Sequence, residues 1–277
     1  MASNSFIELT ARKRAQVLLD TGSARELLGP WDRMESPWLA PQNITPQSDD
    51  GCVVCKGQIG GRAVVAIAVE AAFQGGAVGE VSGAKICAAL DLAARDSERG
   101  QRTSAVLAIE TGGVRLQEAN LGLASIAEIQ ASVLALRQYA PVVFVIAGPV
   151  GCFGGMSIVA GLASYIVMTR EGRLGLNGPE VIEEEAGVEE FDASDRALIW
   201  AINGGEQRYA MGLVDALVRD DAAEIAATVA GLIAQGLPLK TRSQQAAWVR
   251  NRINLLDPSL AWSPAAVRQV WASGEPI

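Results

Sequence analysis

The sequence predicts an α/β fold with a mainly parallel sheet. Short apolar runs recur through the middle of the chain, glycine-rich turns follow them, and stretches with helical periodicity come next. This repeated order is typical of right-handed βαβ units. The chain has 277 residues, of which 49% are hydrophobic and 19% charged, so it can bury a core of this kind.

The N-terminal part predicts a helix and then an extended segment. Thr10 is a suitable N-cap for a helix over residues 11–19, and Gly22 lies beyond the end of that helix. Residues 29–50 are rich in proline, which favours an extended segment lying over a surface or over a partner. Apolar runs on either side of Gly60 and Gly61 then predict a β-hairpin.

The middle of the chain predicts the parallel strands. After a loop with Gly75 and Gly76 and a helix over residues 83–95, we expect strands at 105–109, 142–147 and 165–169. Gly112 and Gly113 break the first of these, and the turn 148–155 breaks the second. A helix running to about residue 137 connects them, and a small-residue helix over 156–163 precedes the third strand.

The C-terminal part predicts helices with an apolar face. They run from about residue 195, with a joint at 211–215 and a new start at residue 222. We expect Trp248, Trp262 and Trp271 to pack this arm against the body or against a neighbouring subunit. The predicted organisation is one domain over 1–277, with an N-terminal helix and wrapping segment (1–50), a core (51–220) and a helical arm (221–277).

Composition excludes several classes of function. The net charge is −8 and no basic run is present, which argues against nucleic-acid binding. The first ten residues do not have the pattern of a secretory signal, and the apolar runs are shorter than the ~20 residues of a membrane span. We therefore expect a soluble, cytoplasmic protein. The chain has no histidine, which excludes Ser-His-Asp and Cys-His sites, a histidine base and HExxH metal sites.

The cysteines and acidic runs have simple interpretations. Cys52 and Cys55 have CxxC spacing, but no second pair completes a zinc site, so buried thiols are favoured and no metal is expected. The run 183–185 of three glutamates is interpreted as a solvated helix face. Glu110 ends a buried strand, and holding a loop by accepting amide hydrogen bonds is favoured over proton transfer.

Two glycine pairs are the candidate reactive positions. Gly112-Gly113 and Gly154-Gly155 are each predicted where a strand leads into a helix, so unpaired amides there could form an oxyanion hole. Glycine at such a turn can also serve only tight turning or close helix packing. Neither pair matches the dinucleotide or Walker pattern, which argues against nucleotide-phosphate hydrolysis.

Several segments together resemble acyl-CoA carboxylase carboxyltransferase subunits. Residues 110–119 resemble their "SGGARMQEG" segment, and 154–157 resemble their "TGG" turn. Residues 175–183 resemble "GFAGPRVIE", residues 73–79 resemble "FMGGSMG", and residues 9–23 are similar to their N-terminal helix. The resemblance runs in order from about residue 9 to 218. It implies a crotonase-like (ClpP/crotonase) spiral of ββα units with a mainly parallel sheet and a helical C-terminal arm.

Within that family the chain resembles the β subunits of biotin-independent malonate decarboxylases. It lacks the N-terminal four-cysteine zinc ribbon of bacterial acetyl-CoA carboxylase β subunits and has half the length of single-polypeptide carboxyltransferases. The resemblance implies an active site shared with a homologous γ subunit, completed by an α subunit and an acyl carrier protein δ subunit. The implied reaction converts the malonyl thioester on the carrier protein into an acetyl thioester and CO₂.

The resemblance also implies roles for particular residues. Gly112, Gly113, Gly154 and Gly155 would be catalytic, through backbone amides that hold the thioester oxygen or the departing carboxylate. Gly75, Gly76, Arg115 and Ser157 would contact substrate. No cofactor would be bound by this chain, since the carrier protein would supply a phosphoribosyl-dephospho-CoA arm.

Three alternatives remain open from the sequence. The chain could be a carboxyltransferase subunit of a biotin-dependent acyl-CoA carboxylase, with the same two amide sites holding an acyl-CoA thioester and the biotin urea oxygen. An enoyl-CoA hydratase or isomerase would need paired carboxylates near the glycines, where Glu110 and Glu118 are the obvious candidates. A scaffold subunit would keep the fold without the chemistry.

Overall fold

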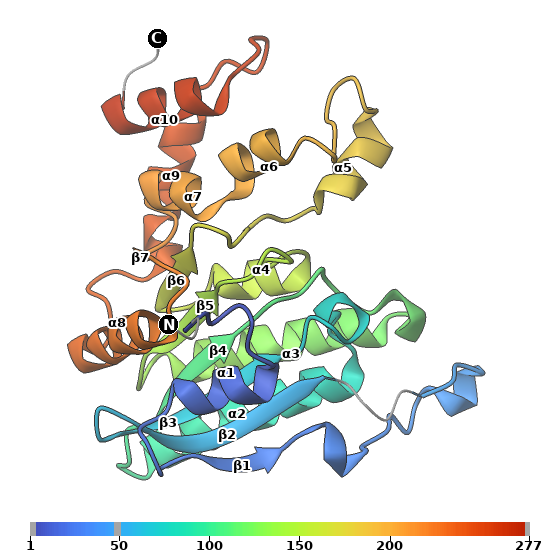
Figure 1. The fold of residues 1–277 in the computed structure, drawn as a ribbon, viewed down its shortest axis with the longest axis vertical. Coiled ribbons are helices and arrows are strands. Elements are labelled where there is room, and N and C mark those ends of the chain that lie inside the picture. Colours follow the sequence, from blue (N-terminus) through green and yellow to red (C-terminus); the bar gives the residue numbers. More distant parts are fainter. Residues whose placement is uncertain (1–3, 47–50, 275–277) are drawn as a thin grey trace.

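A seven-stranded sheet forms the centre of the computed structural model, which describes residues 4–46 and 51–274 (Figure 1). Its strands lie side by side in chain order: β1 (Arg25–Leu28), β2 (Cys52–Ile59), β3 (Arg62–Val69), β4 (Ser104–Ala108), β5 (Val142–Ile146), β6 (Tyr165–Thr169) and β7 (Ala216–Val218). The first three are antiparallel, and β3 to β7 are parallel. The expected mainly parallel sheet is confirmed.

Both faces of the sheet are buried, which explains why the strands are continuous apolar runs in the sequence. In β3, Val65 and Ile67 join one hydrophobic cluster, whereas Val64 and Ala66 join the cluster on the other face. Successive side chains of a strand point to opposite faces, so a strand covered on both sides has no polar position. The same alternation separates Cys52 from Cys55, which lie in different clusters and cannot ligate one metal ion.

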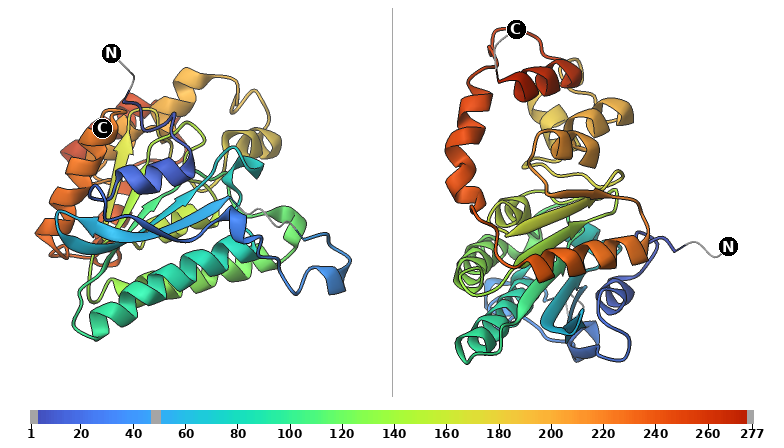
Figure 2. Two further views of the ribbon diagram at one scale, coloured as in Figure 1. Left: turned by 60° about the horizontal axis from the view of Figure 1, so that its bottom comes forward. Right: turned by 90° about the vertical axis from the view of Figure 1, so that its left-hand side faces the viewer.

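Helices cover the two faces as separate layers (Figure 2). On one face lie α2 (Glu80–Glu98), α3 (Leu121–Leu136) and the short α4 (Gly155–Ala160). On the other lie α1 (Ala11–Val17) and α8 (Ala222–Gln235). Ile225 and Val229 of α8 are buried in the same cluster as Ala11 and Ala15 of α1, so α8 is part of this layer.

The helix cap and the hairpin turn predicted in the N-terminal part are both present. Thr10 caps α1, since its hydroxyl accepts the Lys13 amide at 3.4 Å. Gly60 and Gly61 both have positive φ in the turn between β2 and β3. The carboxylate of Asp20 accepts both of their amides, which lowers the pKa of Asp20, so the predicted hairpin is also fastened to the segment after α1.

The structure differs from the expected elements in three places. The short strands β1 and β7 were not predicted from the sequence, and residues 29–46 contain two 3₁₀ turns, η1 (Pro30–Asp32) and η2 (Ala40–Gln42). The helix expected directly after Gly113 begins only at Leu121, following a 3₁₀ turn, η4 (Leu116–Glu118). Ala119 has a φ of 53°, a left-handed conformation that no helix can pass through.

The C-terminal helices rise from the sheet as a separate group (Figure 1). They are α5 (Pro179–Ala186), α6 (Arg196–Asn203), α7 (Gly205–Ala210), α9 (Arg242–Ile253) and α10 (Pro264–Ser273). Two of the three tryptophans join them: the Trp248 and Trp271 rings meet edge to face with centroids 5.7 Å apart, and the Trp271 indole donates to the Met211 carbonyl. The indole of Trp262 donates within its own loop, to Asp257.

Two kinds of feature are absent from residues 4–46 and 51–274, a membrane-spanning helix and a cluster of metal-ligating side chains. None of their helices has both the length and the apolar character needed to cross a membrane. No group of three or more His, Cys, Asp or Glu side chains in these ranges could hold a metal ion.

Candidate functional site

The two predicted glycine pairs meet in space because they follow neighbouring parallel strands. The loops after β4 and β5 run side by side: the Thr111 amide donates to Gly151 O at 2.7 Å, and the Phe153 amide donates to Thr111 O at 3.0 Å. A Cβ placed on Gly154 would lie 3.0 Å from the Cα of Gly113. Loops at the carboxyl ends of adjacent parallel strands form the ligand sites of many α/β proteins, and this pair forms the candidate site here.

A third glycine loop lies against the first. The Gly112 amide donates to Gly75 O at 2.9 Å, and a Cβ on Gly76 would lie 1.9 Å from Glu110 O. Gly75 and Gly76 both have positive φ, 63° and 68°. Only glycine allows the close approach of Gly76 to Glu110, and Gly75 supports the Gly112 loop by accepting its amide.

The expected unpaired amides are not at Gly112 and Gly113. Both amides have acceptors: Gly112 donates to Gly75 O, and Gly113 donates to the Thr111 hydroxyl at 3.1 Å. Because α3 begins at Leu121, no helix N-terminus lies behind this pair. The geometric expectation for this pair is therefore wrong, whereas its place beside Gly154 is as expected.

The second pair does introduce a helix. Gly154 is the N-cap of α4, and its own amide donates to Leu176 O at 2.8 Å. For Gly155 and Met156, the next two residues, the structure records no backbone acceptor among the residues that it describes. The first amides of a helix are the ones without a partner inside it. Sequence reasoning named Gly155 but missed Met156, which could have been found as the second position of the helix.

Gly155 also has a structural role. A Cβ at this position would lie 2.6 Å from the side chain of Ile126 on α3. The interpretation of Gly155 as a packing residue is therefore supported alongside its free amide, and one glycine can serve both.

The Arg115 side chain is enclosed. It is 1% exposed, pairs with Glu118 at 2.7 Å and donates to Ala77 O at 3.1 Å, with its guanidinium 5.5 Å from the centre of the Phe73 ring. Glu118 in turn accepts the amide of Glu80 at the start of α2. Arg115 thus lies behind the glycine loops, where it holds α2 and η4 together, and its predicted contact with substrate stays a prediction.

The two candidate carboxylates of a hydratase-like site are both held in buried ion pairs. Glu118 is bound by Arg115, and Glu110 is bound by Arg14 at 2.6 Å and accepts the Val150 amide at 3.1 Å. Glu110 does hold a loop by accepting an amide hydrogen bond, as expected, but that loop is the one after β5 and not the Gly112 turn for which this role was predicted. This arrangement disfavours the hydratase or isomerase alternative.

The acidic run on α5 lies away from these loops. Glu184 and Glu185 are exposed, and the half-buried Glu183 accepts the Ala193 amide at 2.6 Å. The solvated-face interpretation therefore holds for two of the three residues.

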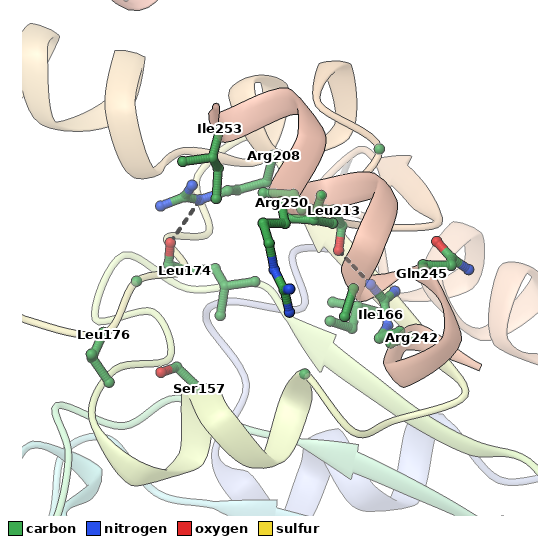
Figure 3. A pocket seen from close by; sticks show the side chains of 15 residues that line it. Ser157, Ile166, Leu174, Leu176, Arg208, Leu213, Arg242, Gln245, Arg250 and Ile253 are labelled. Atoms are coloured by element: carbon green, nitrogen blue, oxygen red, sulfur yellow. Dashed lines mark hydrogen bonds between the residues drawn. The ribbon is translucent and has the colours of Figure 1, made fainter. Parts of the chain in front are cut away.

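A cavity of about 560 Å³ opens beside Ser157 (Figure 3). The Ser157 hydroxyl donates to Gly154 O at 2.7 Å, and Ser157 is the residue of the first turn of α4 that lines the cavity. Its walls are mostly apolar side chains of the segment after β6 and of α9, including Leu174, Leu176 and Ile253. A mostly apolar slot beside α4 suits the arm of a thioester.

Three arginines add positive charge to this cavity. Arg208 donates to Leu174 O and to Asn203 Oδ1, both at 2.8 Å, and its burial lowers the pKa of its guanidinium. Arg242 pairs with Asp215 and donates to Leu213 O. Arg250 projects into the space between α9 and the segment at Leu174 (Figure 3), and no ion pair is recorded for it within the described residues. None of these three arginines was predicted from the sequence as a site residue.

Comparisons with known proteins agree with this geometry. A model of the carboxyl transferase domain matches residues 7–259. Malonyl-S-ACP:biotin-protein carboxyltransferase MADC of Malonomonas rubra is 38% identical over 285 residues, which covers 98% of this chain and 90% of that protein.

Two solved structures of Pseudomonas malonate decarboxylase are similar over most of the chain. One chain of the hetero-tetramer in complex with malonate is 57% identical with a TM-score of 0.92, over 97% of this chain and 98% of that one. A chain of the MdcD-MdcE hetero-dimer is 53% identical with a TM-score of 0.77, over 90% of this chain and 96% of that one. The fold is thus the α/β crotonase-like fold of carboxyltransferases, and the chain belongs to the carboxyl transferase domain family.

Proposed function

We propose that this chain is the β subunit of a malonate decarboxylase. With a homologous γ subunit it would convert the malonyl thioester of an acyl carrier protein into the acetyl thioester and CO₂. The observation that carries the proposal is the likeness to a chain of the Pseudomonas malonate decarboxylase hetero-tetramer, at 57% identity over 97% of this chain. A decarboxylase of this kind needs an enolate site and room for a thioester arm, and we propose that both lie together around α4.

The chemistry would proceed through the thioester enolate. When the bond between the carboxylate and the methylene carbon breaks, its electron pair moves onto the thioester oxygen, and a proton from the partner or from water then completes the acetyl group. The amides of Gly155 and Met156, for which no backbone acceptor is recorded, would donate to that growing negative charge. A preorganised amide donor commonly contributes about 3–4 kcal/mol to such a transition state.

The Gly112-Gly113 loop would shape the space opposite these amides. Its glycines leave room for an oxygen to approach between the loops, and Gly113 lies against Gly154. We retain Gly112, Gly113, Gly154 and Gly155 as the proposed reactive positions. Ser157 would border the thioester arm. Gly75, Gly76 and Arg115 stay predicted substrate contacts, and they would also support the loops.

Exposed apolar side chains beside the site favour a partner subunit. Leu116 and Ile158, each three residues after a glycine pair, are 83% and 50% exposed, and Leu176, whose carbonyl accepts the Gly154 amide, is 59% exposed. Apolar groups gathered around a site commonly mark a protein interface. We propose that the γ subunit covers this face, and that α and δ subunits complete a cytoplasmic complex whose carrier protein bears a phosphoribosyl-dephospho-CoA arm.

A carboxyltransferase reaction is the second candidate. The Malonomonas rubra relative is a malonyl-S-ACP:biotin-protein carboxyltransferase, and it covers nearly the whole chain at 38% identity. The same amides would serve either reaction, because both pass through the thioester enolate. The greater likeness to the Pseudomonas chains favours the decarboxylase.

Reconstitution separates the two candidates. The chain is co-expressed with its γ homologue, and the loss of malonyl thioester is followed with and without a biotin carrier protein. Acetyl thioester and CO₂ formed without biotin are expected. Turnover that requires the biotin carrier, with carboxybiotin as product, would instead make the protein a carboxyltransferase.

A further inference from the structure

A buried ion pair joins the N-terminal helix to the loops of the candidate site. Arg14 of α1 and Glu110, which follows β4, pair at 2.6 Å, and their side chains are 8% and 4% exposed. Arg14 is held on its other side by the carbonyls of Phe6 and Ile7, at 3.1 and 2.6 Å. With three hydrogen bonds fixed in this way, the guanidinium holds the Glu110 carboxylate in one place.

The second carboxylate oxygen of Glu110 holds the loop that leads to α4. It accepts the Val150 amide at 3.1 Å, and a Cβ on Gly148 would lie 1.9 Å from it. The loop therefore wraps directly around the carboxylate, and Gly148 is glycine because the Glu110 side chain occupies the space of its Cβ. Six residues after Val150 the same loop presents the amide of Met156.

The main chain of Glu110 fixes the other glycine loop. Its carbonyl lies where a Cβ of Gly76 would be, and Thr111, the next residue, bonds to Gly151 on one side and to Phe153 on the other. Glu110 is thus the residue at which the loops at 75–76, 111–113 and 148–155 all meet.

We propose that Arg14 and Glu110 are positioning residues for the enolate site. The pair fixes the position of the 148–155 loop relative to Glu110, and hence the direction of the Gly155 and Met156 amides, without touching substrate. This inference rests on the proposed function for its kinetic consequence. Its structural half, control of the loop by Glu110, stands apart from the reaction and can be measured alone.

The test uses two double variants in the complex with the partner subunit. Replacing one member of a buried pair would leave an uncompensated charge, so Arg14→Met is combined with either Glu110→Gln or Glu110→Met. Both combinations are uncharged and similar in volume. Only the Gln side chain still offers an oxygen to the Val150 amide, so the comparison isolates that hydrogen bond.

We expect kcat of the Arg14→Met/Glu110→Met enzyme to be about tenfold or more below that of Arg14→Met/Glu110→Gln, since small displacements of catalytic groups lower turnover steeply. KM should differ by less than about threefold, because the lost interaction is one made in the transition state. Equal kcat values in the two variants would overturn the proposal.

Amide hydrogen exchange supplies the readout that does not need activity. Peptides covering residues 148–156 should exchange faster in the Glu110→Met combination than in the Glu110→Gln combination, while peptides of β2 and α2 exchange equally. The matched control is Lys56→Met/Asp96→Asn, which removes a partly buried 2.6 Å pair distant from the loops and should leave exchange at 148–156 unchanged.

The two readouts separate the possible failures. If the unsubstituted complex makes no acetyl thioester but exchange at 148–156 still responds to Glu110→Met, the proposed function fails and control of the loop stands. If exchange at 148–156 is the same in both combinations, the positioning role is overturned whatever the activity.

Discussion

Gly112 and Gly113 are neighbours that meet different steric demands. Gly112 is exposed, has an ordinary φ, and would bring a Cβ no closer than 3.6 Å to its nearest atom, Gly75 O. Gly113 is buried and has a φ of 139°, which side chains rarely adopt. A substitution at Gly113 would therefore strain the backbone, whereas one at Gly112 changes mainly the space in front of the loop.

The Gly112→Val variant is expected to fold normally and to turn over slowly. Its side chain fits beside Gly75 but stands where a substrate oxygen would approach, so kcat/KM should fall about tenfold or more while stability changes by less than about 1 kcal/mol. Steady-state kinetics and thermal unfolding check this. Gly231→Val, at an exposed glycine of α8 with no neighbour within 4 Å, is the control for activity. Full activity in Gly112→Val would confine the site to the α4 amides.

At the scale of elements, the predictions succeeded where an apolar run or a helix cap within the element's own residues indicates it. The three central strands, the hairpin and α1 were predictable because each has an apolar run or cap in its own residues. β1 and β7 were not, since each is only a few residues long and is held in the sheet by its neighbour: Arg25 pairs with Lys56, and Ala216 pairs with Val167. Such pairing leaves no local signal.

The candidate site was predictable only in part for the same reason. That Gly113 and Gly154 meet follows from adjacent parallel strands and could be expected. The late start of α3 could not, because a contact between distant residues enforces it: Glu118 is held by the Glu80 amide, 38 positions earlier in the chain. The cavity likewise depends on how α9 returns over the segment at Leu174.

A substitution of Arg250 on α9 tests whether this cavity binds the thioester arm. Its guanidinium projects into the cavity and would attract an anionic thioester arm, so Arg250→Gln should raise KM about tenfold and leave kcat nearly unchanged. The effect should shrink as salt is added, because exposed charges are screened. The control, Lys13→Gln on the far side of the sheet, removes the same charge. An equal rise in KM in both variants would exclude a specific role for Arg250.

At the scale of the whole molecule, the sheet is covered on both faces, and Cys55 of β2, Cys87 of α2 and Cys152 after β5 lie in or against the covered core. Burial raises the pKa of Cys55 to about 11 and that of Cys87 to about 12, and it also raises the pKa of Cys152. In the unfolded chain these thiols ionise at about pH 8.5. Above that pH the unfolded state binds fewer protons than the native state, so rising pH favours unfolding.

The free energy of unfolding should therefore fall between about pH 9 and about pH 11, by at most about 1.4 kcal/mol per pH unit for a fully buried thiol. It should be independent of these thiols below the unfolded pKa. Urea unfolding at a series of pH values measures the slope. Cys152→Ala should make the decline shallower, and an unchanged slope in that variant would contradict the assignment.

The attachment of the N-terminus to the far end of the sheet has a consequence for biosynthesis. The amides of Phe6 and Ile7 donate to Asp220, and Asn4 O accepts the amide of Ala222, so the first described residues are fastened at the start of α8. Residues 4–7 must therefore wait for residues 220–222, more than 200 positions later in the chain, before they can dock. Arg14 lies within the same stretch, so its pairing with Glu110 would be completed only after residues 220–222 have been synthesised.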